Sequence, residues 1–477
     1  MTKLGTSYDL SRRAFIGGTA AFAGLPLLGA QPQKKGKEKP KGKDKPKAKE
    51  PEVVLPPNAP WETPSGDATP PVMVRRLYLD LAGRIPTVEE AKAFVNSKDP
   101  QRLLGLVERL LASDAFADYW GMRFCDILRV KSEFPINLWP NAVYVYHRRI
   151  REFVKKDEPW DAFTRALLSA TGSDFRDAEA NFFRATARRT PEGLAEAAAL
   201  TFLGEEYAEL PASTQKEYAK YFSRVRVKNT REWKEEIVYL DDGPADATPE
   251  AFMAQLEGPL APQFVATPVQ RVHWWIYNTL APKSKCEKWV NAFRNGGYRL
   301  KPLLRHVFAQ TEYRQGPGKG GFPARRMDAE VLDDVLCTLT GARRDFGSIA
   351  PEPYSFLPPT RKSVLVEDGS ISSAFLILFG RPARDSGLLT ERDNRIKAKQ
   401  RLYLYNSSKL WRDLGRMVGK SDIKSLSHAD QIRELYMRFL SRPPVKDELF
   451  YFDQKNNINA RDVAWFLLNS REFLYRI

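Results

Sequence analysis

Apolar residues recur every three or four positions through most of the chain after residue 70. This spacing puts the apolar side chains on one face of a helix and predicts amphipathic helices. Alternation of apolar and polar residues, which is typical of strands, is limited to 363–366 and 375–379. We therefore expect a mainly α fold with few short strands. The helical pattern is clearest in 103–111, 142–154, 163–168, 194–203, 300–308, 331–339 and 432–440.

One stretch interrupts the helical pattern near the middle of the chain. Residues 241–268 are rich in Pro, Gly and acidic side chains, a composition typical of a boundary or an exposed crossing. A chain of 477 residues is long enough for two domains of ordinary size. We expect two helical domains, at 69–240 and 269–477, joined by a linker at 241–268.

A helical hairpin is repeated near the two ends of this region. Thr87 and Glu90 have the spacing of a capping box in the first copy. The simplest interpretation is a recurring structural hairpin with no chemistry of its own. The first copy contains Leu77, Tyr78, Arg84, Pro86, Glu90 and Phe94, then Leu110, Leu111, Ser113 and Phe116; the second contains Leu435, Tyr436, Arg442, Pro444, Glu448 and Phe452, then Leu467, Leu468, Ser470 and Phe473.

The N-terminus has the pattern of a bacterial twin-arginine export signal. Arg12 and Arg13 precede Phe15 and a weakly apolar run, 17–30, that is too short for an ordinary membrane-spanning helix. We expect residues 1–30 to be a signal peptide. The expected location is the periplasm, the cell envelope or the medium.

The net charge of +16 is concentrated at this end of the chain. Residues 1–50 hold 12 Lys and Arg but only 4 Asp and Glu, so half of the excess lies there. The segment 31–68 is rich in Lys and Pro and cannot bury apolar surface, which predicts a disordered linker. We therefore expect no nucleic-acid partner. Peripheral membrane contact through the Lys-rich tail is one interpretation and a solvated spacer is the other.

The usual catalytic and metal-binding motifs are missing from the sequence. The four histidines are dispersed, and the three cysteines form no C-x-x-C pair. Buried apolar surroundings are the expected place for these cysteines, with one disulfide possible. We expect neither a metal ion nor a cofactor.

Two polar clusters carry the candidate chemistry. In the first, Asp126 and Arg129 are three apart on a predicted helix, which favours an ion pair. The aromatic, Asn-rich loop that follows suits a sugar ring or a peptide. The alternative is an ion pair that ties helices together. The candidates here are Asp126, Arg129, Glu133, Asn137, Trp139, Asn141 and His147.

The second cluster is a Gly- and Pro-containing loop behind the apolar run 375–379. Its arginines would suit a carboxylate or sulfate, since the guanidinium group binds such anions through two parallel hydrogen bonds. A solvated loop, or one that joins domains by ion pairs, is the alternative. The candidates here are Arg381, Arg384, Asp385, Arg392 and Asn406.

Several stretches occur in the order found in one known family. Residues 75–87 (Arg-Arg-Leu-Tyr-Leu-Asp-Leu-Ala-Gly-Arg-Ile-Pro-Thr), 297–303, 311–315, 325–330 and 439–444 are similar to a secreted two-domain family of unknown function from Planctomycetes and Verrucomicrobia. Relatives often carry a C-x-x-C-H stretch and a cytochrome c domain. Here the segment 201–204 is followed by residues 205–211, which contain no Cys or His, so the redox or metal role of that stretch in relatives is not expected for this chain.

These patterns predict an exported envelope protein that works by binding. It would be a scaffold or recognition component for extracellular polysaccharide or a co-exported protein. The alternative is a hydrolase acting on extracellular polysaccharide, sulfated chains included. In that case Asp126 and Glu133 would serve as acid and base, and Arg381 and Arg384 would hold an anion.

Overall fold

The computed structural model describes residues 66–316, 322–350, 353, 355–453 and 458–477. These residues are 60% helical with few short strands, which confirms the mainly α fold. The predicted signal peptide, 1–30, and all but the last three residues of the predicted linker, 31–68, lie outside this part. In the described part of the chain, no helix is both long and apolar enough to cross a membrane.

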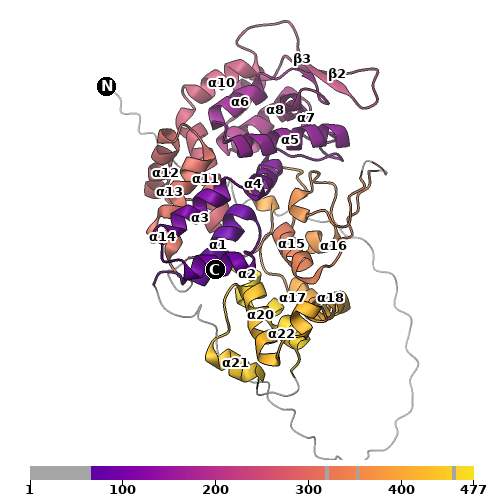
Figure 1. Cartoon of the computed structure of the whole chain (residues 1–477). Coiled ribbons are helices and arrows are strands. Elements are labelled where there is room, and N and C mark those ends of the chain that lie inside the picture. The colour runs from indigo at the N-terminus through magenta and orange to yellow at the C-terminus, as the bar shows by residue number, and fades with distance from the viewer. Residues whose placement is uncertain (1–65, 317–321, 351–352, 354, 454–457) are drawn as a thin grey trace, which may run out of the picture.

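One group of helices, at the top of Figure 1, includes α5 (Pro140–Lys156). It carries a three-stranded antiparallel sheet in the order β1–β3–β2, in which Val227 pairs with Val238. The group comprises α6 (Trp160–Leu168), β1 (Gly172–Ser173), α7 (Asn181–Arg184), α8 (Pro191–Ala198), the π-helix η3 (Ala199–Leu203), α9 (Ala212–Tyr221), β2 (Val225–Asn229), β3 (Glu236–Leu240) and α10 (Pro249–Glu257).

A second group contains the first helices of the described chain together with helices from the middle of the chain (Figure 1). Helix α4 (Asp114–Ile127) packs against both α1 and α5 and so links the two groups. The second group comprises α1 (Pro70–Ala82), α2 (Val88–Asn96), α3 (Arg102–Leu111), α11 (Ala261–Tyr277), α12 (Lys283–Asn295), α13 (Leu300–Ala309) and α14 (Thr311–Arg314).

The remaining elements lie mostly in the right and lower parts of Figure 1, but the C-terminus lies beside α1. They are β4 (Arg325–Arg326), α15 (Ala329–Thr340), the 3₁₀ turn η5 (Ser363–Leu365), α16 (Ala374–Leu378), α17 (Ala398–Asn406), α18 (Ser408–Val418), α19 (Ser421–Lys424), α20 (His428–Leu440), α21 (Lys446–Asp453), α22 (Ala460–Asn469), α23 (Arg471–Leu474) and β5 (Tyr475–Arg476).

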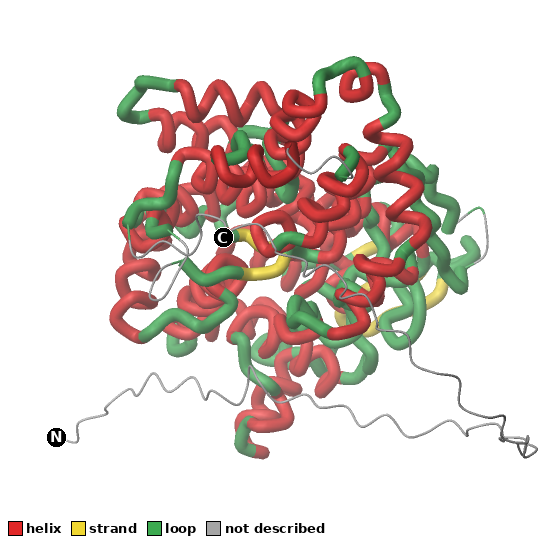
Figure 2. The backbone as a smooth tube through the Cα atoms, turned by 90° about the horizontal axis from the view of Figure 1, so that it is seen from below, coloured by secondary structure: helices red, strands yellow, loops and turns green. Residues whose placement is uncertain are grey.

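The end of the chain packs against helix α1. Arg75 donates from Nη1 to the carbonyl of Phe439 (2.7 Å) and from Nη2 to that of Phe473 (3.0 Å). Arg76 donates from Nε to the carbonyl of Ile477 (2.9 Å). Strand β5 pairs with β4 near the C-terminus, in the middle of the view in Figure 2. Residues of the first described helix and residues near the C-terminus therefore lie in the same buried region.

Buried apolar side chains form one continuous core that extends from Met73 to Phe473. The segment 241–268, expected to be a linker, contains α10 and the first part of α11. Phe252 and Phe264 from these helices are buried in the core. The division into domains at 69–240 and 269–477 stays a prediction, but the segment between them is helical and contributes to the packing.

Both strand candidates were wrong. Residues 363–365 form the 3₁₀ turn η5, because the carboxylate of Asp334 accepts hydrogen bonds from the backbone N–H groups of Ser363 and Val364. Residues 374–378 form α16, which Ser373 caps by accepting a hydrogen bond from the N–H of Leu376. Short apolar runs fit a buried helix as well as a strand, so local contacts decided between them.

The repeated residues make matching contacts in both hairpins. The first helix ends at a left-handed residue in each copy, Gly83 (φ 58°) and Ser441 (φ 61°). Arg84 then binds Glu90 in the first copy, as Arg442 binds Glu448 in the second. The capping box predicted at Thr87 is present. Ser113 and Ser470 cap the closing helices through equivalent hydrogen bonds.

Candidate functional site

The two predicted polar clusters meet in space. Asp126, in the last turn of α4, accepts hydrogen bonds from Arg384 Nε (2.9 Å) and Arg392 Nη2 (2.7 Å). A second contact joins Lys131 Nζ to Asp385 Oδ1 at 2.5 Å. These contacts fix the loop that follows α16 against the end of α4.

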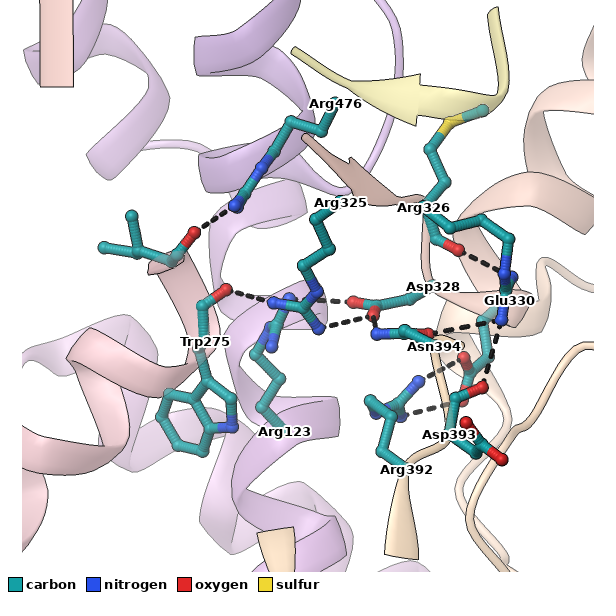
Figure 3. A network of polar contacts seen from close by, with 12 residues as sticks. Arg123, Trp275, Arg325, Arg326, Asp328, Glu330, Arg392, Asp393, Asn394 and Arg476 are labelled. Atoms are coloured by element: carbon teal, nitrogen blue, oxygen red, sulfur yellow. Dashed lines mark hydrogen bonds and ion pairs between the residues drawn. The ribbon is translucent and has the colours of Figure 1, made fainter. Parts of the chain in front are cut away.

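The meeting point is part of a larger buried network (Figure 3), which we call the arginine–carboxylate centre. Asp328 accepts from Arg123 Nη2 (2.7 Å), Arg325 Nη2 (2.9 Å) and Asn394 Nδ2 (2.7 Å). Arg392 also reaches Glu330, with Nη1 2.6 Å from Oε2. The centre comprises Arg123, Asp126, Arg325, Asp328, Glu330, Arg384 and Arg392.

Local structure explains how these groups converge. Asp328 and Glu330 lie at the N-terminus of α15, where the helix dipole favours negative charge. The loop reverses at Gly380 (φ 82°), where a Cβ would lie 1.9 Å from the carbonyl oxygen of Asp393. Arg384 is itself left-handed (φ 62°). These turns bring Arg384 and Arg392 to the same carboxylate.

The charges of the centre compensate one another. Burial by itself would raise the pKa of Asp328, but Arg123, Arg325 and Arg392 outweigh it and hold that pKa well below its usual value. Burial would likewise lower the pKa of Arg392, yet Asp126 and Glu330 raise it well above its usual value. Asp328 therefore stays ionised at neutral pH. A general acid needs the opposite shift of its pKa, so this pKa does not favour Asp328 as a general acid.

Arg129 does not pair with Asp126, so that prediction was wrong. Helix α4 ends at Ile127, and Arg129 is left-handed (φ 56°), which turns its side chain away from the helix face. Its Nε donates to the carbonyl of Ala185 at 2.6 Å, and Nη1 lies 3.3 Å from the hydroxyl of Thr201. Arg129 also lines a cavity of about 170 Å³, together with Asp385.

The arginines of the second cluster are already bound by the protein itself. Arg381 is buried and donates to the carbonyls of Asp368 and Ile371. Its Nε lies 3.4 Å from a carboxylate oxygen of Glu330. Arg384 is likewise buried and donates from Nη1 to the carbonyl of Glu367 (2.5 Å). The loop therefore does not present these guanidinium groups to an external anion.

The other candidates are spread over several surfaces. Glu133 Oε1 accepts from Ser348 Oγ and the N–H of Ala350, both at 2.7 Å. Trp139 packs edge-on against Trp233, with ring centroids 4.6 Å apart. The remaining four do not form a common site: Asn137 is left-handed and exposed, Asn141 is exposed in the first turn of α5, His147 is buried in α5, and Asn406 is exposed at the end of α17.

The histidines and cysteines remain separate from one another. Burial lowers the pKa of His147 to about 3 and that of His273 to about 4. The three cysteines are free thiols. Among the residues that the structure describes, no group of three or more His, Cys, Asp and Glu side chains is placed to hold a metal ion.

A cleft of about 500 Å³ opens beside the first hairpin, and we call it the hairpin cleft. Its walls come from the α1–α2 turn, the start of α4, α15, η5 and α20. This volume lies in the usual range of ligand sites, whereas the cavity within the arginine–carboxylate centre measures about 10 Å³, room for about one water. The apolar lining residues are Ala82, Ile85, Pro86, Val88, Ala115, Val335, Leu339, Val364 and Leu365.

Most charges in the hairpin cleft are paired within the protein. Asp118 binds Arg151 and Asp334 binds Arg344, each at 2.5 Å. Arg438 binds Glu434 and Asp422. Within the described residues, Lys362 forms no ion pair, and Arg84 binds Glu90 and stacks on the ring of Tyr78 while its Nε binds no carboxylate. The cleft therefore combines apolar walls with charged groups of both signs, Glu89 among them.

One segment of the chain matches a known protein family. Residues 60–242 match the family model described as PSCyt2, Protein of unknown function (DUF1549). That segment is therefore similar to a domain whose activity is not established. No curated protein and no solved structure matches the chain. The two-domain organisation and the planctomycete origin implied by the resemblance stay predictions.

Sequence reasoning missed the residues at the core of this site. Arg123, Arg325, Asp328 and Glu330 were not candidates, although 325–330 was noted as a familiar stretch. The dense charge of Arg325, Arg326, Asp328 and Glu330 at a helix start was the available signal. The sequence identified Arg84 only as a member of the repeated hairpin. That its Nε binds no carboxylate could be learned only from the structure.

Proposed function

We propose that this protein is an exported component of the cell envelope that acts by binding, with the hairpin cleft as its recognition site. The observation that carries the proposal is the contrast between the two polar regions. The arginine–carboxylate centre is closed and leaves room for about one water, while the hairpin cleft is open and is lined by Arg84 and Lys362, whose Nε and Nζ bind no carboxylate of the described chain. The centre would serve as a rigid support for the cleft.

The candidate acid and base give little support to catalysis. Both oxygens of Asp126 accept from arginines, and one oxygen of Glu133 is held by two donors. A general base must reach the proton that it removes from a substrate. The hydrolase interpretation therefore stays a prediction without a geometric argument behind it.

The lining of the hairpin cleft favours a protein partner over a polysaccharide. Its walls are aliphatic and contain no aromatic residue among the described lining side chains. Sugar rings usually stack on aromatic faces, whereas apolar side chains of a polypeptide fit aliphatic walls. We therefore propose a co-exported protein as the occupant of this cleft.

A polysaccharide role is the second candidate, and one surface feature favours it. Trp233 is 62% exposed, contacts Trp139, and has Lys234 Nζ 6.0 Å from its ring centroid. An exposed indole beside a cation suits an acidic sugar chain. Trp233→Ala should abolish retention on acidic polysaccharide while leaving retention by a protein partner unchanged.

Blocking the hairpin cleft tests the main proposal. Thr338 is exposed on α15 at the cleft, so Thr338→Trp should fill the cleft without disturbing the core. The matched control is Ser213→Trp on α9, because Ser213 is also a small, exposed hydroxyl residue on a helix but does not line the cleft. We expect only Thr338→Trp to lose retention on envelope fractions of the host. Equal retention of both variants would overturn the assignment of the cleft.

Export is the other part of the proposal. Arg12→Lys combined with Arg13→Lys removes the paired guanidinium groups that define the signal. We expect this variant to accumulate in the cytoplasm of the host, while a charge-preserving Lys3→Arg control is exported. Cell fractionation with an antibody against the folded region distinguishes the two results.

A further inference from the structure

The two copies of the hairpin differ in how many carboxylates bind their corresponding arginines, Arg442 and Arg84. In the second copy, Arg442 binds Glu448 through Nη1 (2.7 Å) and Nη2 (2.9 Å). It also binds Glu472 through Nε and Nη2, both at 2.7 Å. Two carboxylates thus fill both sides of one guanidinium group, and the side chain of Arg442 is only 7% exposed.

The first copy reproduces half of this arrangement. Arg84 binds Glu90 through Nη1 and Nη2, both at 2.7 Å. The residue that corresponds to Glu472 is Ala115, which follows Ser113 by two positions as Glu472 follows Ser470. Ala115 has no carboxylate, so the Nε side of Arg84 binds no carboxylate of the described chain. The guanidinium group stacks on the ring of Tyr78, as that of Arg442 stacks on Tyr436. Arg84 is accordingly 35% exposed.

The vacant side of Arg84 coincides with the hairpin cleft. Arg84 and Ala115 both line it. The other carboxylates that line the cleft do not take this place: Asp118 is held by Arg151, Asp334 by Arg344 and Glu434 by Arg438. Glu89 also lines the cleft, and the ion pairs of the described residues do not join it to Arg84. The chain therefore contains an occupied and an unoccupied version of the same carboxylate site.

We propose that Arg84 binds the carboxylate of an acidic side chain on the partner polypeptide, through the Nε and Nη2 donors that Arg442 offers to Glu472. This inference rests on the proposed function and names the chemistry recognised there. A carboxylate matches the two parallel donors of the guanidinium fork, which makes the contact strong and directional.

The surroundings indicate what should lie beside that carboxylate. In the second copy, Glu472 is followed by Phe473, and the residue that corresponds to Phe473 in the first copy, Phe116, is buried as well. The chain therefore already fills that apolar position itself. Ile85 and Leu339 add apolar wall to the cleft that Arg84 lines, so an apolar residue beside the acidic one in the partner would contact this wall. Lys362, exposed at the cleft, adds a further attraction for negative charge.

A blocked dipeptide probes this chemistry directly. Acetyl-Glu-Phe-amide, acetyl-Gln-Phe-amide and digalacturonic acid would each be titrated against the full chain at low salt. We expect the Glu peptide to bind at least tenfold more tightly than the Gln peptide, since a charge-assisted hydrogen bond is lost in the latter. Equal affinities, no saturable binding of either peptide, or a preference for digalacturonic acid would overturn the inference.

A variant that copies Glu472 of the second hairpin into the first one gives a further test. Ala115→Glu recreates the second copy and should occupy Arg84 from within, with a tenfold or greater loss of Glu-peptide affinity. It should also melt at a higher temperature than Ala115→Gln, which has the same size without the charge. Arg84→Gln should lose the preference for Glu over Gln. Identical melting temperatures and affinities for the Glu and Gln variants at position 115 would contradict the proposal.

The same variants separate this inference from the function on which it rests. If Thr338→Trp abolishes envelope retention but Ala115→Glu does not, the cleft binds a partner by other means and only the role of Arg84 fails. If neither variant affects retention, both proposals fail.

Discussion

Arg392 Nη2 lies 2.7 Å from Asp126 Oδ2, although 266 residues separate the two in sequence. The contact joins the end of α4 to the loop after α16. Both side chains are largely buried, with 6% and 14% of their surface exposed. A buried pair of this kind is sensitive to the loss of either partner, because the other charge is then left uncompensated.

Neutralising Asp126 should therefore destabilise the fold. Asp126→Asn keeps the shape and leaves Arg384 and Arg392 without their shared carboxylate. We expect the free energy of unfolding to fall by about 3 to 5 kcal/mol. The control is Asp118→Asn on the same helix, whose partner Arg151 is more exposed, with an expected loss of about 1 kcal/mol. Urea unfolding measures both, and equal losses would contradict the prediction.

The two hairpin arginines should differ in their contribution to stability. Arg442→Ala removes a buried cation between Glu448 and Glu472, at an expected cost of about 3 to 5 kcal/mol. Arg84→Ala removes a partly exposed cation with one carboxylate partner, at an expected cost of about 1 kcal/mol. Thermal unfolding of the two variants side by side is the test. An equal or larger loss for Arg84→Ala would contradict this prediction.

The turn at Gly380 should not accept a side chain. Gly380→Ala would place Cβ 1.9 Å from the carbonyl of Asp393 and hold Ala at φ 82°. We expect a loss of about 2 kcal/mol or more from this clash and from the left-handed backbone. Gly347→Ala is the control, because nothing lies within 4 Å of its Cβ and its φ is ordinary. Similar stabilities of the two variants would contradict the requirement for glycine at position 380.

His147 should make the protein less stable in acid. Burial, followed by the charges of Arg384, Arg361 and Arg151, lowers its pKa to about 3, whereas an unfolded histidine titrates near 6.5. Between these values the unfolded chain binds the extra proton, so stability is fully present above about pH 6.5 and is lost as the pH falls toward 3.

The expected loss from this one group is on the order of 4 kcal/mol over that window. His147→Gln cannot take up the proton, so its unfolding free energy should vary less with pH than that of the parent chain. Chemical unfolding at pH 7, 5.5 and 4 gives the comparison. A parallel pH dependence in both proteins would mean that His147 is not the group responsible.

The helical elements could be predicted from the sequence, because each depends on local periodicity. The apolar spacing within 142–154 and 432–440 reappears as α5 and α20. The hairpin repeat was also readable, since Arg84 and Arg442 bind partners only six residues away. The runs 363–366 and 375–379 were misjudged, because Asp334 and the cap at Ser373 determine their conformation.

The candidate site was predictable only in part. Both polar clusters were identified, but spacing along the chain does not reveal that Arg384 and Arg392 reach Asp126. The expected Asp126–Arg129 pair failed because α4 ends at Ile127, two residues too early for the helical spacing to apply. Asp328 was overlooked because its burial among Arg123 and Arg325 depends on packing between distant segments.

The attachment of the last residues to α1 has a consequence for synthesis on the ribosome. The carbonyls of Phe473 and Ile477 are hydrogen-bond acceptors for Arg75 and Arg76, and these partners are separated by 398 and 401 residues. Until translation delivers them, Arg75 and Arg76 in the first described helix each lack one of the acceptors that they have in the folded protein, where both side chains are buried. Helix α1 therefore cannot reach its final environment early, and contacts of such long sequence separation slow folding. A chain cut before residue 470 should resemble an incompletely folded intermediate, with α1 exposed to proteases.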